Sequence, residues 1–244
     1  MTCDIFLRSY AADLPWVPWA LRSIHKFVTG IREIIVVVPA NDYEQFKGLN
    51  LTKEALASSR FAAPEFDDYL VQQADKLHAD LYTDADLILY WDSDVIAIRP
   101  FSPLTLMLGG RPRCLETPFE KLVNADGSPA TPWKEIAERA LGHPVGKERM
   151  RSHPMMTHRS ALIGLREYME ALHKKPLVDY IASQPGRQFS EFNILHSWAA
   201  RHSPHLFTFW DTEERGVPEP FVKQFHSWSG ITPEIRAEME RILA

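Results

Sequence analysis

The chain has 244 residues, of which 45% are hydrophobic and 24% charged, an ordinary composition for a globular protein with a substantial core. The net charge of −5 and the lack of a dense lysine and arginine stripe exclude a general nucleic-acid binder. No run approaches the roughly 18 apolar residues of a membrane span, so no transmembrane segment is predicted and only peripheral membrane contact is left open.

The chain has two cysteines, Cys3 and Cys114, and neither belongs to a C-x-x-C pair. This spacing excludes a zinc knuckle and a dithiol redox motif. A disulfide between the two stays open, but a reducing compartment is the simpler interpretation. Residues 1–7 lack a basic flank and a long apolar stretch, so they predict a first strand and not a signal peptide. We therefore expect a cytoplasmic protein.

Strand and helix patterns alternate through the first half of the chain. Short apolar or β-branched runs predict strands at residues 5–10, 34–38 and 87–91. Apolar spacings of three and four predict a helix at residues 14–27. A second helix is expected at residues 65–81, and one side of it should carry Tyr69, Gln73, Lys76 and Asp80. The alternation predicts an α/β fold with an open, mostly parallel, twisted sheet flanked by helices.

The second half begins with a turn-rich segment at residues 116–153, which we expect to be mobile and to order when a ligand binds. A short helix is predicted inside it at residues 133–141. Further helices are predicted at residues 160–173, 191–202 and 233–243. The pattern predicts one domain with a helical C-terminal elaboration.

A pair of aspartates follows the strand predicted at residues 87–91, in the sequence Asp92-Ser93-Asp94. Ligands of open α/β sheets bind at the carboxyl ends of strands, where this pair lies. Carboxylate oxygens suit a hard divalent cation, so Mn²⁺ or Mg²⁺ is the expected metal. The alternative is a turn in which the two side chains only cap the end of a strand.

Residues 81–95, followed by Arg99 and Pro100, resemble the central segment of glycosyltransferases with the GT-A fold. The segment is most similar to an uncharacterised bacterial family related to glycosyltransferase families 8 and 32. Residues 189–193 and 226–230 are also similar to that family. The resemblance implies a nucleotide-sugar donor, such as a UDP- or GDP-sugar, that is bound through a metal on Asp92 and Asp94.

The same resemblance implies further parts of the site. It implies His226 as a third metal ligand, and a saccharide or lipid-linked acceptor. On this interpretation residues 1–115 bind the donor, and residues 154–244 form the acceptor half. The alternative for His226 is a packed, hydrogen-bonded core residue, which is the more common role of a lone histidine beside aromatic residues.

Other candidate residues are polar side chains at predicted element ends. The end of the first strand offers a cation for phosphate and an aromatic ring for a base, in the sequence Arg8, Ser9, Tyr10. Lys76 could reach the diphosphate from a helix. Glu191 and Asn193 are candidate catalytic residues, Glu191 as the group that orients or deprotonates an acceptor hydroxyl. The alternative interpretation of the strand end and of Lys76 is that these side chains face solvent. The alternative for Glu191 is a residue that only begins a helix.

Two other functions are compatible with the aspartate pair. A phosphohydrolase of the haloacid dehalogenase type also carries Asp-x-Asp after an apolar strand, but its motif normally has Thr or Val where Ile96 stands. A non-catalytic nucleotide-sugar binder would have the same sequence features. The basic stretch of Lys147, Arg149 and Arg151 is either a solvated loop or a local phosphate site.

Overall fold

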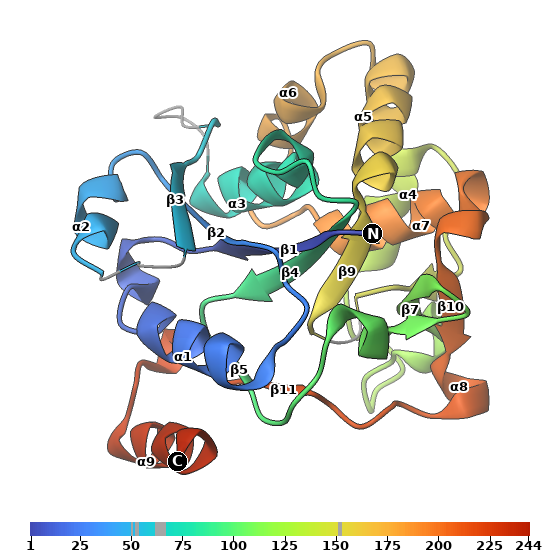
Figure 1. The fold of residues 1–244 in the computed structure, drawn as a ribbon. Helices are drawn as coiled ribbons and strands as arrows, with labels where there is room; N and C mark the ends of the chain where they lie inside the picture. Colours follow the sequence, from blue (N-terminus) through green and yellow to red (C-terminus); the bar gives the residue numbers. More distant parts are fainter. Residues whose placement is uncertain (50, 52–53, 62–66, 151–152) are drawn as a thin grey trace.

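The computed structural model describes residues 1–49, 51, 54–61, 67–150 and 153–244. Its centre is a five-stranded sheet in the order β3-β2-β1-β4-β9 (Figure 1). The first four of these strands are parallel and β9 is antiparallel to β4. The strands are β1 (Cys3–Arg8), β2 (Ile34–Val38), β3 (Glu54–Ser58), β4 (Leu87–Asp92) and β9 (Met155–His158).

Helices cover both faces of this sheet. The helices are α1 (Val17–Phe27), α2 (Tyr43–Lys47), α3 (Asp68–Leu77), α4 (Trp133–Leu141), α5 (Arg159–His173), α6 (Leu177–Ala182), α7 (Glu191–His202), α8 (Thr212–Arg215) and α9 (Pro233–Leu243). On one face α1 packs against alternate residues of β1 and β4, such as Ile5 and Leu89. On the other, residues such as Phe6 and Tyr90 pack against α3, α5 and α7. Burial on both faces explains the continuous apolar runs in the strands.

A smaller sheet and a two-stranded ribbon complete the fold. The smaller sheet runs in the order β10-β7-β6, and β8 also pairs with β7. Its strands are β6 (Met107–Leu108), β7 (Arg111–Pro118), β8 (Lys147–Glu148) and β10 (Thr208–Asp211). The ribbon joins β5 (Val95–Ala97) to β11 (Val222–Gln224), so the late part of the chain returns to the strand that follows the aspartate pair.

The α/β fold and the mostly parallel sheet predicted from the sequence are confirmed. The helices predicted at residues 133–141, 191–202 and 233–243 have these same bounds in the structure. The helix expected from residue 14 begins at Val17. The helix expected at residues 65–81 is α3, followed by a 3-10 turn at Ala79–Leu81, and its predicted start lies outside the described residues.

Both cysteines are buried and free, so the disulfide left open by the sequence does not form. The segment at residues 116–153 contains the end of β7, all of α4 and β8. Its mobility stays a prediction. A membrane-spanning helix is not found within the described ranges, where every helix falls short of a span in length or in hydrophobicity.

Candidate active site

A cavity of about 750 Å³ opens at the carboxyl ends of β1 and β4. Arg8 and Asp92, the last residues of these strands, are direct partners in the sheet register. The cavity therefore lies where parallel α/β sheets bind ligands. Residues predicted from the sequence supply much of the wall of this main cavity, namely Arg8, Ser9, Tyr10, Lys76, Asp92, Ser93, Asp94, Glu191 and His226.

Asp92 lies between two basic side chains. Its Oδ1 is 3.0 Å from Lys76 Nζ, and its Oδ2 is 3.4 Å from His153 Nε2. Burial would raise the pKa of this carboxyl group, but the charges of Lys76 and His153 outweigh burial and lower it. Asp92 is therefore a carboxylate throughout the neutral range.

Asp94 has a different environment, although only Ser93 separates it from Asp92. Its carboxylate accepts hydrogen bonds from Ser227 N at 2.9 Å and Gln224 Nε2 at 3.3 Å, both neutral donors. Burial and the neighbouring Asp92 charge raise its pKa. The pairing of β11 with β5 brings these donors from the far end of the chain. The site thus holds negative charge that its own residues do not neutralise.

Lys76 links Asp92 to Glu191, the first residue of α7. Its Nζ lies 3.0 Å from Asp92 Oδ1, 3.1 Å from Glu191 Oε1 and 5.2 Å from the centre of the Phe192 ring. Burial would lower the pKa of this ammonium group, but the two carboxylates raise it instead. The side of α3 predicted from the sequence to carry Tyr69, Gln73 and Lys76 does line the main cavity.

Asp80, predicted on that same side, lies elsewhere. It pairs with Arg166 at 2.6 Å, because α3 ends at Leu77 and the 3-10 turn changes the direction of the side chain. Asn193 lies outside the cavity wall and is fully buried. Its Oδ1 accepts from Arg149 N and its Nδ2 donates to Ser190 Oγ, which is a structural arrangement.

Arg8 belongs to a buried network at the end of β1. Its Nε donates to Asp75 Oδ2 at 2.7 Å, and Asp75 Oδ1 accepts from Ser59 Oγ and Tyr82 Oη. Arg8 is 4% exposed, and the Ser9 hydroxyl beside it is buried without a hydrogen-bond partner among the described residues. Tyr10 is 43% exposed, so its ring is open to a ligand.

Several residues of the cavity wall were not included in the site predicted from the sequence. Asp13 accepts a hydrogen bond from Ser93 Oγ at 2.7 Å and so fixes the middle of the aspartate motif. His153, Arg187 and Trp228 also line the cavity. These residues belong to loops and turns, and only the position of Asp13 shortly after a strand could have marked it as a candidate.

His226 lies at the wall of the main cavity, and its ring stacks on Trp228 with 4.5 Å between ring centres. Its φ of 59° lets the next backbone N–H point at Asp94. Among the residues that the structure describes, no three His, Cys, Asp or Glu side chains gather closely enough to hold a metal. The metal set of Asp92, Asp94 and His226 therefore stays a prediction.

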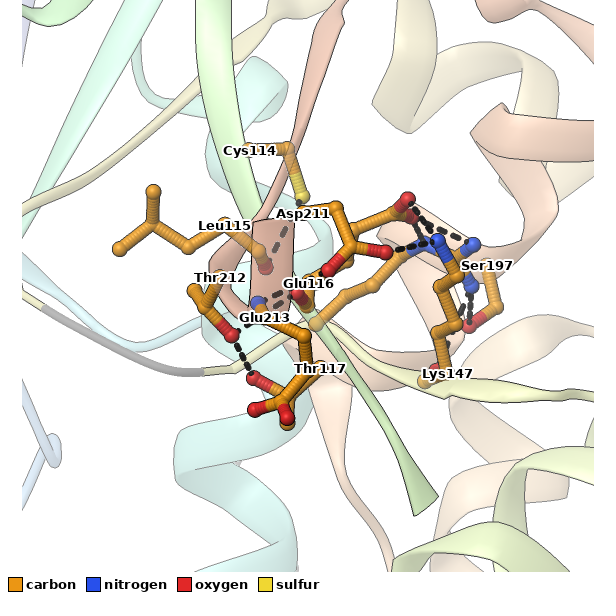
Figure 2. Close-up of polar contacts among 10 residues, drawn as sticks. Cys114, Leu115, Glu116, Thr117, Lys147, Ser197, Asp211, Thr212 and Glu213 are labelled. Carbon is orange, nitrogen blue, oxygen red and sulfur yellow. Dashed lines mark hydrogen bonds and ion pairs between the residues drawn. The ribbon is translucent and has the colours of Figure 1, made fainter. Parts of the chain in front are cut away.

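The basic stretch noted in the sequence is neutralised by carboxylates beside β8. Lys147 Nζ lies 2.7 Å from both Glu116 Oε1 and Asp211 Oδ2. Figure 2 draws the polar contacts among these side chains as dashed lines. Arg149 pairs with Glu116 at 2.8 Å. Arg151 lies outside the described residues. These contacts bind β7, β8 and β10 together, so Lys147 and Arg149 serve the fold here.

The fold and the main cavity define an α/β protein with a cavity lined by charged residues at the carboxyl edge of a mostly parallel sheet. The chain belongs to a family of unknown function, DUF6492, which it matches over residues 4–228. No curated protein matches it. Among solved structures, it is similar to the glycosyltransferase GlyE of Streptococcus pneumoniae TIGR4, with a TM-score of 0.52 and 11% identity. The match covers 100% of this chain but 60% of that chain, and at this identity it establishes the fold.

Proposed function

We propose that the chain is a metal-dependent glycosyltransferase that moves a sugar from a UDP- or GDP-sugar to a saccharide or lipid-linked acceptor. The observation that carries this proposal is the pair of carboxylates, Asp92 and Asp94, on the wall of a cavity of about 750 Å³. A cavity of this size is large enough for a small-molecule ligand of this class. The similarity of the fold to GlyE supports the same class of reaction.

A divalent cation fits the charges of the site. The hydrogen bonds that Asp13 and Asp94 accept come from neutral groups, and no lysine or arginine within the described ranges pairs with either. Carboxylate oxygens are ligands that Mg²⁺ and Mn²⁺ prefer. Asp92 and Asp94 would hold the ion, with His226 as the proposed third ligand. A bound ion supplies Lewis-acid stabilisation of the departing diphosphate.

The remaining groups bind and orient the donor in this proposal. Arg8 places a buried cation beside the cavity, and the exposed Tyr10 ring offers a surface on which a base can stack. Lys76 holds Asp92 in its ionised form. Because the Glu191 carboxylate pairs with Lys76, we assign it to orienting a substrate hydroxyl.

The segment at residues 116–153 contributes Trp133, Met150 and His153 to the cavity wall. We propose that this segment orders when the donor binds. Hydrogen exchange of residues 116–150 should slow when the nucleotide-sugar and Mn²⁺ are added together. Equal exchange in both states would contradict this part of the proposal.

A thermal-shift screen of UDP-, GDP-, CMP- and dTDP-sugars, with and without Mn²⁺, tests the function. A donor at 100 times its Kd should stabilise the protein by about 2.7 kcal/mol, and only with metal. Asp92→Asn and Asp94→Asn should each abolish the metal-dependent shift, while the exposed Asp126→Asn serves as the matched control. His226→Ala should weaken Mn²⁺ more than Mg²⁺. If no donor gives a metal-dependent shift, the proposal fails.

A further inference from the structure

A second, smaller cavity of about 160 Å³ lies beside the main cavity. His153 and Pro220 line both, so one shared wall separates them. Most of the small cavity is apolar, with side chains from β7, β9 and the segment before β11, including Leu115, Met155, Met156 and Phe221. An apolar cavity of about 150 Å³ is known to hold one benzene ring. The small cavity therefore has room for a single six-membered ring.

One polar side chain in this wall, His196, has an unused hydrogen-bonding atom. His196 is 3% exposed, and its Nδ1 is 3.1 Å from the carbonyl oxygen of Arg149. Because a carbonyl only accepts, Nδ1 carries the proton and Nε2 holds a lone pair. Burial lowers the pKa of His196 to about 4, so the ring is neutral at pH 7. Nε2 accepts no hydrogen bond from any described residue.

A buried acceptor without a partner is unusual, because leaving it unpaired costs about 1–3 kcal/mol. Any group that donates a hydrogen bond, such as a water molecule or a ligand hydroxyl, can satisfy His196 Nε2. The shared wall carries a second unpartnered ring nitrogen, since His153 Nδ1 is also buried and makes no hydrogen bond with the described residues. The guanidinium of Arg149, which also lines the cavity, is already occupied by Glu116.

We propose that the small cavity is the acceptor subsite of the transfer proposed above, and that it binds one hydroxylated ring whose O–H donates to His196 Nε2. This inference rests on the proposed function, because the bound ring is an acceptor only if the protein transfers a sugar. The shared wall supports the assignment, because it places such a ring next to Asp92 and the main cavity. A nucleotide is too large for the cavity, and a plain alkyl chain would leave His196 unpaired.

Methionine methyl NMR can observe the two cavities separately. Met155 and Met156 line the small cavity, Met150 lines the main cavity, and the buried Met169 and Met239 line neither, so they serve as references. Cyclohexanol and fluorocyclohexane are ring probes of similar size, and only the alcohol has an O–H. We expect both to shift Met155 and Met156, with cyclohexanol binding about 3- to 10-fold more tightly, which is the value of one hydrogen bond.

His196→Phe keeps a flat aromatic ring and removes the acceptor atom. In this variant the two probes should bind equally, with Met169 and Met239 unshifted if the fold is intact. Val217 is 67% exposed at the edge of the small cavity, so Val217→Trp should obstruct it and weaken cyclohexanol without a folding defect. Leu104→Trp, at a residue 75% exposed and outside the cavity, is the matched control.

Two results would overturn the inference. One is that neither ring shifts Met155 and Met156. The other is that the preference for cyclohexanol persists in His196→Phe. Failure of the proposed function would be seen differently, as an unresponsive Met150 with every nucleotide-sugar and Mn²⁺. The two failures are therefore distinguishable in one set of spectra.

Discussion

Lys76 is the residue whose replacement should reveal most about the main cavity. It is buried between Asp92 and Glu191 at 3.0 and 3.1 Å, so Lys76→Met keeps the apolar stem but leaves two carboxylates facing each other. Removing one partner of a buried ion pair costs about 3–5 kcal/mol. For a chain of this length each kcal/mol lowers Tm by about 2–4 °C, so we expect a loss of about 6–20 °C.

The stability lost in Lys76→Met should depend on pH. In the wild type, Asp92 has a lowered pKa, so its stabilising contribution is present above the unfolded value of about 3.9 and is lost below it. In Lys76→Met the facing carboxylates should have raised pKa values, so the variant gains stability as pH falls. The difference in unfolding free energy between wild type and variant should therefore be largest near pH 7.5 and smaller at pH 5.

Urea unfolding of both proteins at pH 7.5 and pH 5 measures this difference. Lys47→Met is the matched control, because Lys47 pairs with Glu44 on the exposed surface and its loss should leave stability unchanged. Adding Glu191→Gln to Lys76→Met should restore part of the stability at pH 7.5. A cost below about 1 kcal/mol, or one that does not change with pH, would refute the ion-pair argument.

Three further substitutions test other parts of the structure. Asp94→Asn should raise the Tm of the free protein at pH 7, because a carboxyl group with a raised pKa destabilises the fold once it ionises; a lower Tm would contradict this. His196 is neutral in the fold but charges on unfolding, so the wild type should lose about 3 kcal/mol between pH 6.5 and 4. In urea titrations, the unfolding free energy of His196→Phe should lack that loss. If the variant shows the same pH dependence as the wild type, the argument about His196 is wrong. Gly164→Ala would place a methyl group 2.6 Å from Trp198 Cη2, so it should cost about 1–3 kcal/mol in unfolding free energy, and adding Trp198→Phe should recover part of it.

Features that depend on residues close together in the sequence could be predicted from the sequence. Periodicity predicted α5 and α7 because a helix face repeats every three to four positions, and the buried parallel strands appear as apolar runs such as that of β2. The position of Asp92 and Asp94 after such a run placed them at the ligand edge of the sheet. The side of α3 that carries Lys76 followed from the same periodicity.

Contacts between distant segments were beyond this reasoning. β10 pairs with β7 across about a hundred residues, and no local pattern in either strand specifies the other as its partner. His196 illustrates the consequence for function. In the sequence it is a lone histidine in an amphipathic helix, and that setting usually indicates a packed residue. Only the hydrogen bond of its Nδ1 to Arg149, the unpartnered Nε2 and the place of the residue in a cavity wall make it a candidate for binding a hydroxyl group.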